Sequence, residues 1–119
     1  MSVTNRRILV VEDDALIAML LEDMLSELDY VVAGTAAGLE DALVMAKEGD
    51  FDGAILDVSL AGKSSLPVAR LLDEMNKPYM FATGYGALPE GMEGSGRRLL
   101  NKPYQLHQLE AALSSLEIG

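Results

Sequence analysis

Acidic side chains follow two separate apolar segments of this chain, each at the point where the segment ends. Three acids at positions 12–14 come directly after Ile8–Val11, and Asp57 comes directly after Ala54–Leu56. Short continuous apolar runs are typical of strands buried on both faces of a parallel sheet. Because ligands bind beyond the carboxyl ends of such strands, we expect these carboxylates to meet at one edge. Clustered carboxylates repel one another, so the pattern predicts a bound cation, and hard oxygen ligands suit Mg²⁺.

Two more polar residues end strand-like segments farther along the chain. Thr83 ends the apolar segment Tyr79–Ala82, and Lys102 closely follows Leu99–Leu100. Each of these residues alone has an ordinary explanation, since threonine suits a strand and lysine suits the surface. An acid after a strand is often only a helix N-cap, and we expect Asp14 to be one. Polar residues at the ends of four of the expected strands nevertheless favour a functional site.

The rest of the chain alternates between strand-like and helix-like segments. Apolar residues recur at helical spacing in four segments, which separate short apolar runs from one another. The expected helices cover Ile17–Leu28, Leu39–Ala46, Leu66–Met75 and Leu106–Leu116. The expected strands cover Ile8–Val11, Tyr30–Ala33, Ala54–Leu56, Tyr79–Ala82 and Leu99–Leu100. This alternation predicts an α/β fold in which helices cover both faces of a parallel sheet.

One segment breaks the alternation, because glycines and Pro89 are concentrated between Gly84 and Gly96. Each glycine inside a helix costs about 1 kcal/mol relative to alanine. We therefore expect a helix in this region to be short, frayed or absent. Gly49, by contrast, is expected to end the helix that begins at Leu39.

The composition excludes several classes of protein. The 119 residues carry a net charge of −10, so we expect no nucleic-acid partner. The chain has no cysteine and one histidine, His107, which excludes disulfides, zinc–thiolate sites and multi-histidine metal sites. The longest apolar run, Ala15–Leu21, is too short to cross a bilayer, and no signal peptide is recognisable. We therefore expect one cytoplasmic domain with no membrane partner.

Four segments together resemble the receiver domain of bacterial two-component response regulators. They are Ile8–Asp14, Ala54–Val58, Phe81–Gly84 and Lys102–Tyr104. The resemblance covers essentially the whole chain, in order, and implies a single receiver domain over residues 1–119 without an output domain. It also implies the flavodoxin-like, doubly wound fold, with five parallel strands in the order 2-1-3-4-5.

The resemblance implies a phosphoprotein that receives its phosphoryl group from a histidine kinase or a histidine phosphotransfer protein. Asp57 matches the phosphoacceptor, Thr83 the hydroxyl that follows the phosphoryl group, and Lys102 the lysine that pairs with it. Pro103 matches a proline whose preceding peptide bond is usually cis. The carboxylate forms an acyl phosphate, and the domain catalyses only its own phosphorylation and dephosphorylation. Its output would be binding of a downstream partner, or service as a phosphate relay or sink.

The resemblance also implies the ligands of one Mg²⁺ ion. Asp13 and Asp57 match direct carboxylate ligands, and Glu12 matches an acid that acts mostly through metal-bound water. Ser59 matches the residue that lends a backbone carbonyl. These implied ligands agree with the bound cation that the repulsion between the clustered carboxylates predicts.

The sequence departs from the receiver pattern at several positions. Many receivers carry tyrosine or phenylalanine at the position of Leu99, and rotation of that ring reports phosphorylation. Ala61 stands where proline is common, and Ser65 stands where glycine is common. The segment Phe81–Gly84 resembles a subgroup of stand-alone receivers, known mainly from alphaproteobacteria, that is named for its Phe-Ala-Thr-Gly motif. Because the usual switch residue is missing, we expect the segment Tyr85–Arg97 to become ordered on phosphorylation.

The main alternative is a small phosphatase of the haloacid-dehalogenase type, which also uses an aspartyl nucleophile after a strand. Such an enzyme would carry a second aspartate two residues after Asp57, where this chain has Ser59. A flavodoxin is not expected, because the acids after the first strand would repel the phosphate of FMN. The segment Gly62–Ser64 suggests a P-loop, but Asp57 replaces the glycine that this motif requires five residues earlier.

Two further features are expected to be structural. Lys77–Tyr79 repeats the Lys-Pro-Tyr sequence, but it precedes a strand and should lie at the edge opposite Asp57. His107 lies at the start of the last expected helix, where a solvent-facing side chain is expected because no triad partner is nearby.

Overall fold

Strands and helices alternate along the chain in the computed structural model, which describes residues 6–83, 98–102 and 104–116. The described strands are β1 (Arg7–Val11), β2 (Val31–Ala36), β3 (Gly53–Asp57), β4 (Ser59–Leu60), β5 (Lys63–Ser64), β6 (Tyr79–Thr83) and β7 (Arg98–Asn101). The described helices are α1 (Ala15–Glu27), α2 (Leu39–Glu48), α3 (Leu66–Glu74) and α4 (Leu106–Ser115).

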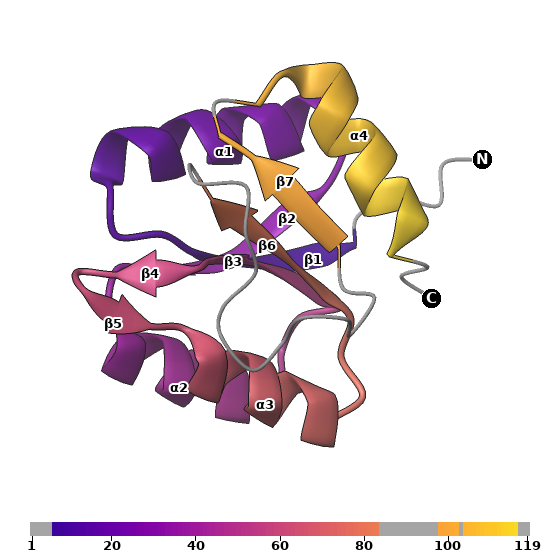
Figure 1. Ribbon diagram of the computed structural model, residues 1–119. Coiled ribbons are helices and arrows are strands. Elements are labelled where there is room, and N and C mark those ends of the chain that lie inside the picture. The colour runs from indigo at the N-terminus through magenta and orange to yellow at the C-terminus, as the bar shows by residue number, and fades with distance from the viewer. Residues whose placement is uncertain (1–5, 84–97, 103, 117–119) are drawn as a thin grey trace.

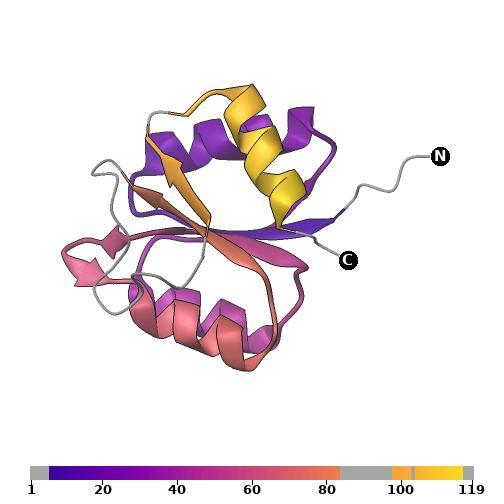
Figure 2. The same ribbon diagram turned by 45° about the vertical axis from the view of Figure 1, so that its right-hand side comes forward.

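Five of the strands form one parallel sheet in the order β2-β1-β3-β6-β7. Since β6 and β7 are the fourth and fifth strands of this sheet, the order confirms the predicted 2-1-3-4-5 arrangement. Helices α1 and α4 cover one face of the sheet, and α2 and α3 cover the other (Figure 1). The same three layers are visible from a second direction in Figure 2. The predicted α/β architecture is therefore correct.

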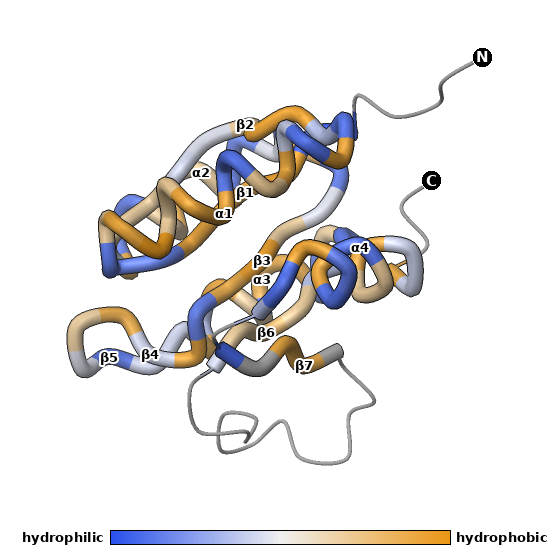
Figure 3. Tube along the Cα trace, turned by 90° about the horizontal axis from the view of Figure 1, so that it is seen from above, coloured by the Kyte–Doolittle hydropathy of each residue, from blue (hydrophilic) through white to orange (hydrophobic). Residues whose placement is uncertain are grey.

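The central strands are apolar on both faces because each face is covered by helices. Leu9, Leu56 and Phe81 pack among α2 and α3, and we call this cluster of buried residues the α2–α3 core. Their neighbours along the same strands, Ile8 and Ile55 among them, pack among α1 and α4 and form the α1–α4 core. Successive side chains of a strand point to opposite faces, so one continuous apolar run supplies both cores. The hydrophobic stretch along β3 lies at the middle of the molecule (Figure 3).

The predicted helix ends hold in two places where the residue type dictates them. The side chain of Asp14 accepts hydrogen bonds from the backbone amides of Leu16 and Ile17, at 3.0 and 3.2 Å, and is the N-cap of α1. Gly49 adopts a left-handed conformation with φ 70° and ends α2, as expected. The side chain of Asp14 and the backbone conformation of Gly49 therefore determine these two boundaries.

The second strand runs from Val31 to Ala36, later than the predicted Tyr30–Ala33. It is an edge strand, and its first residue, Val31, is exposed, so it lacks the continuous apolar run of the central strands. The pairing register with β1 also shifts between Ile8 and Leu9, which places Gly34 opposite Leu9. An irregular edge strand gives a weak periodic signal, which explains the error.

A short hairpin that was not predicted follows Asp57. Strands β4 and β5 pair in antiparallel fashion around the two turn residues Ala61 and Gly62. Both turn residues have positive φ angles, 52° and 86°, as two-residue hairpin turns commonly require. Only the glycine indicates such a turn in the sequence.

The expectations about 84–96, the Tyr85–Arg97 switch and the cis peptide at Pro103 lie outside the described residues. Within the described part of the chain, no helix is long and apolar enough to span a membrane.

Candidate functional site

Three carboxylates meet at the edge of the sheet where β1 and β3 end. Glu12 and Asp13 follow β1, and Asp57 is the last residue of β3. One carboxylate oxygen from each residue lies within 4.8 Å of the others. Glu12 is 4% exposed and Asp57 is 9% exposed, whereas Asp13 faces solvent. The predicted convergence of acids from the first and third strands is therefore present in the structure.

Lys102 is the cation of this cluster. Its Nζ atom lies 2.6 Å from Oε1 of Glu12 and 3.1 Å from Oδ2 of Asp57. The lysine comes directly after β7, and its backbone amide donates a 2.8 Å hydrogen bond to the carbonyl of Thr83 at the end of β6. The parallel pairing of β6 with β7 therefore carries the lysine to the same edge as the acids.

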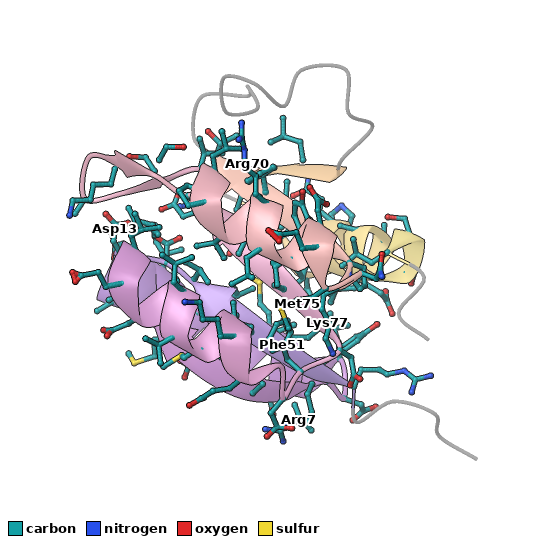
Figure 4. The ribbon with its side chains drawn as sticks, turned by 90° about the horizontal axis from the view of Figure 1, so that it is seen from below. Arg7, Asp13, Phe51, Arg70, Met75 and Lys77 are labelled. Atoms are coloured by element: carbon teal, nitrogen blue, oxygen red, sulfur yellow. The ribbon has the colours of Figure 1, made fainter. Side chains whose placement is uncertain are left out.

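The hairpin after Asp57 holds the carboxylate of Asp13 in place. The backbone amide of Ala61 donates a 2.9 Å hydrogen bond to Oδ2 of Asp13. In Figure 4, Asp13 lies at the end of the molecule that carries the hairpin. Sequence reasoning missed this contact because it depends on the turn conformation of Ala61, and the only local signal was the neighbouring Gly62.

The remaining residues around the site come from the segment that contains the hairpin and from the end of β6. The backbone amide of Ser59 donates a long 3.4 Å hydrogen bond to Oδ1 of Asp57, and its side chain is exposed. Thr83 is 2% exposed and ends β6, beside β3 in the sheet. Ser65, the residue that stands in place of a common glycine, is buried, and its hydroxyl donates to the carbonyl of Val58 at 3.2 Å. Each predicted site residue therefore belongs to one sheet edge or to the hairpin beside it.

The site has too few cations for its carboxylates, and the pKa values show the effect. Burial raises the pKa of Glu12 to about 7, although the hydrogen bond from Lys102 acts in the opposite direction. Burial alone would lower the pKa of Lys102, but its contacts with Glu12 and Asp57 outweigh that effect and raise this pKa. Burial would raise the pKa of Asp13, yet the hydrogen bond from Ala61 helps to hold it below its usual value. One ammonium shared by two buried carboxylates leaves Glu12 incompletely compensated.

The charge of the site suits a divalent cation. When ionised, the three carboxylates carry −3 and Lys102 carries +1, which leaves −2. Carboxylate oxygens are hard ligands, and Mg²⁺ is commonly held by one or two carboxylates together with water. Glu12, Asp13 and Asp57 therefore form an acidic group that could hold Mg²⁺.

Tyr104 lies beside Lys102, and the sequence predicted no role for it beyond its place in the segment Lys102–Tyr104. It lies two residues after Lys102 and packs against the α1–α4 core. Burial, followed by the negative charges of Glu12 and Asp57, raises the pKa of its hydroxyl, which therefore stays protonated. Tyr104 and Lys102 also line one cavity together with residues of α1.

Three features that were expected to carry no chemistry have structural explanations. Lys77 is at the opposite end of the molecule from Asp13 (Figure 4), where its Nζ donates to the carbonyl of Phe51 at 2.7 Å. Its ammonium also lies 5.2 Å from the centroid of the Phe51 ring, a cation–π geometry. His107 is exposed on α4, as predicted. Gly62–Ser64 belongs to the hairpin and does not open a helix, so the rejection of a P-loop is confirmed.

Comparison with known proteins agrees with this geometry. Residues 8–114 match the family of the response regulator receiver domain. The transcriptional regulatory protein TcrA of Mycobacterium tuberculosis is 34% identical over an alignment 119 residues long, which covers 96% of this chain and 47% of that protein. The chain spans about half the length of the curated relatives that it matches.

Two solved structures resemble the whole chain. The solution structure of SdrG from Sphingomonas melonis has a TM-score of 0.82 and 39% identity, covering 98% of both chains. The anti-anti-sigma factor PhyR from Bartonella quintana has a TM-score of 0.81 and 25% identity, covering 98% of this chain and 48% of that one. The family match, the sheet order and the cluster of acids with one lysine lead to a single assignment. This chain belongs to the response regulator receiver domain family of two-component signalling systems.

Proposed function

We propose that the chain, as a single receiver domain over residues 1–119, accepts a phosphoryl group on Asp57 from a histidine kinase or a histidine phosphotransfer protein. The observation that carries this proposal is the environment of Asp57. The side chain is 9% exposed, it ends a central strand, and its Oδ2 atom lies 3.1 Å from the ammonium of Lys102. A fixed carboxylate beside a cation can attack phosphorus while the cation neutralises the charge that develops on the phosphoryl oxygens.

The proposed step is an in-line transfer from phosphohistidine. A carboxylate oxygen of Asp57 forms a bond to phosphorus as the bond between phosphorus and the imidazole nitrogen breaks, and the electron pair stays on that nitrogen. Lys102 pairs with the transferred group, and the hydroxyl of Thr83 follows it. Catalysis then consists of positioning and charge neutralisation, so the domain promotes only its own phosphorylation and dephosphorylation.

The metal ligands proposed for this step are Glu12, Asp13, Asp57 and the backbone carbonyl of Ser59, with Mg²⁺ as the ion. The charge of −2 left by the three carboxylates and Lys102 supports a dication. When bound, Mg²⁺ would neutralise phosphoryl oxygens during the transfer. The chain's own contribution is to fix the carboxylates, through the end of β3 for Asp57 and through the Ala61 amide for Asp13.

The proposed output is phosphorylation-dependent binding of a partner protein in the cytoplasm, or service as a phosphate relay or sink. A net charge of −10 supports a protein partner over a nucleic acid. The similarity to PhyR, which is described as an anti-anti-sigma factor, also favours a protein partner. The alternative of a haloacid-dehalogenase phosphatase loses support, because the family match is to receivers and Ser59 occupies the place of the second aspartate.

Acetyl phosphate, a small phosphoryl donor, tests the proposal without knowledge of the kinase. The wild-type chain should gain the mass of one phosphoryl group in the presence of Mg²⁺, and it should gain much less in chelator. Asp57→Asn should gain none. Asp52→Asn is the matched control, because Asp52 contacts the amide of Arg7 at the other end of the sheet and should leave phosphorylation unchanged. Equal labelling of the wild type and Asp57→Asn would overturn the assignment.

A further inference from the structure

The hydroxyl of Tyr104 is buried without a hydrogen-bond partner, a condition noted for no other side-chain polar atom in the described residues. Buried polar groups in folded proteins are nearly always hydrogen-bonded, so an unpaired one needs an explanation. Tyr79 shows the ordinary arrangement, because its buried hydroxyl donates to both carboxylate oxygens of Asp73, at 3.1 and 3.2 Å. The position of Tyr104 in this structure is therefore costly in a way that the position of Tyr79 is not.

A cavity beside Tyr104 gives its ring a second place to go. The cavity has a volume of about 280 Å³ and is lined by Ile17, Leu20, Met24, Lys102 and Tyr104. A cavity of roughly 150 Å³ with apolar walls already accommodates a benzene ring. The walls contributed by α1 are apolar, so an aromatic ring that turned into this space would keep favourable contacts.

Lys102 connects this cavity to Asp57. It lines the cavity with Tyr104, and its ammonium contacts both Glu12 and Asp57. Phosphorylation of Asp57 would place about two negative charges on phosphoryl oxygens in place of the single charge of the carboxylate, a net gain of about one negative charge. The lysine would be drawn toward those charges, which would change the packing of the wall that it shares with Tyr104.

Leu99 cannot supply this connection. It packs against the α2–α3 core, on the opposite side of the sheet from Tyr104, which packs against the α1–α4 core. An aliphatic side chain also has no polar group whose burial could differ between two states. Among the described residues near Lys102, Tyr104 therefore has both an unsatisfied polar atom and space to move into.

We propose that Tyr104 is a two-position aromatic residue that reports phosphorylation of Asp57 to the α1–α4 face of the domain. In the unphosphorylated protein its ring holds the position seen here, with the hydroxyl buried and unpaired. In the phosphorylated protein Lys102 moves, the ring turns into the cavity, and the hydroxyl gains a hydrogen bond with water. The change alters the surface beside the exposed α1 residues Leu16 and Leu20. This inference rests on the proposed function, since it requires that Asp57 be phosphorylated.

The first experiment tests the unpaired hydroxyl and needs no phosphorylation. The thermal midpoint of unphosphorylated Tyr104→Phe should equal that of the wild type or lie a few degrees above it, because no hydrogen bond is lost. Tyr79→Phe is the matched control and should melt about 4 °C lower, because it loses its bond to Asp73. A Tyr104→Phe midpoint as low as that of Tyr79→Phe would overturn the inference.

The second experiment follows the ring itself by fluorine NMR of protein that contains 3-fluorotyrosine. The Tyr104 signal, identified by its absence in Tyr104→Phe, should shift and become solvent-accessible after treatment with acetyl phosphate and Mg²⁺, while the Tyr79 signal should not. Leu20→Trp, which fills the cavity, should abolish the shift. Met19→Trp is the control, because Met19 is exposed on the same helix and does not line the cavity.

Intact mass measured on the same samples separates the possible failures. A phosphorylated wild-type protein whose Tyr104 signal does not change would overturn this inference and leave the proposed function standing. A shift that survives unchanged in phosphorylated Leu20→Trp would also overturn it, because the ring would not be using the cavity. A protein that gains no phosphoryl mass on Asp57 would overturn the proposed function and this inference with it.

Discussion

The backbone amide of Ala61 donates a 2.9 Å hydrogen bond to the carboxylate of Asp13, which joins positions 48 residues apart. A proline at position 61, common in receivers, could not make this contact, because proline has no N–H group. The hairpin turn at Ala61 and Gly62 thus connects the segment after Asp57 to the segment after β1. This contact fixes the most exposed carboxylate of the site.

Substitutions at Ala61 should separate the effect of the N–H group from that of backbone conformation. Ala61→Pro should lower the free energy of unfolding by about 2 kcal/mol or more, because it loses the bond to Asp13 and cannot adopt the observed φ of 52°. Ala61→Gly keeps the N–H group and adopts positive φ freely, so it should be about 1 kcal/mol more stable than the wild type. Urea unfolding of the three proteins measures both differences. Greater stability of Ala61→Pro than of the wild type would contradict the described turn.

Glu12 should make the stability of the metal-free domain depend on pH. Its pKa is raised in the folded state, from 4.5 to about 7, so the folded state binds the proton more tightly than the unfolded state does. The contribution of Glu12 to stability is therefore largest below about pH 4.5, falls as pH rises through this window, and is constant above about pH 7. The lowered pKa of Asp13 acts below this window, and the raised pKa of Lys102 acts far above it.

Glu12→Gln removes this pH dependence and provides its test. The unfolding free energy of the variant minus that of the wild type should increase by about 1–3 kcal/mol as the pH rises from 4.5 to 8. Chemical unfolding in the presence of chelator at these two pH values measures the gain. Glu110→Gln, an exposed change on α4, is the control and should show no comparable gain. Identical pH profiles for Glu12→Gln and the wild type would contradict the raised pKa.

Asp57→Asn should stabilise the metal-free domain or leave its stability unchanged. The substitution reduces the site charge from −2 to −1, and Lys102 keeps its 2.6 Å contact with Glu12. Thermal melts in chelator should therefore place Asp57→Asn at or above the wild type, and addition of millimolar Mg²⁺ should raise the midpoint of the wild type more than that of the variant. Asp52→Asn controls for the general effect of removing one negative charge. A clearly lower midpoint for Asp57→Asn alone would refute the repulsion argument.

Lys102 and Mg²⁺ should compete for the same carboxylates. Because the lysine contacts Glu12 and Asp57, Lys102→Met should bind Mg²⁺ about tenfold more tightly than the wild type does, an estimate from removing one charge near the site. NMR titration should show the largest shifts near Asp13, Asp57 and Ser59. Lys77→Met is the matched control, because Lys77 lies at the opposite end of the molecule, and its affinity should be unchanged. Weaker binding by Lys102→Met than by the wild type would refute the competition.

The sequence predicted the parts of this structure that local pattern controls. Continuous apolar runs identified β1, β3 and β6 because both faces of these strands are buried, and Asp14 and Gly49 marked helix ends through their side-chain and backbone chemistry. The edge strand β2 was misplaced because half-exposed residues give no clear period. The meeting of Glu12 and Asp57 followed from the rule that parallel strands end at one edge.

Contacts that depend on three-dimensional detail were not predictable. The Ala61 amide reaches Asp13 only because two turn residues adopt positive φ angles, one of which is not a glycine. The contact of Lys102 with Glu12 depends on the reach of a long side chain across the sheet edge, because β3 and β6 lie between β7 and β1. The unpaired hydroxyl of Tyr104 is a property of the packed core, and no periodic pattern encodes it.

The most direct test of the account is to locate the phosphoryl group on the chain. Acyl phosphates react with borohydride, which reduces the modified carboxyl group of an aspartate to the alcohol of homoserine. After treatment with acetyl phosphate and Mg²⁺, then borohydride, peptide mass spectrometry should find homoserine at position 57 and at no other aspartate. Homoserine at position 13 would contradict the assignment of Asp57 as the phosphoacceptor. A phosphoryl group that resists hydroxylamine would also contradict it, because serine and threonine phosphates resist hydroxylamine and acyl phosphates do not.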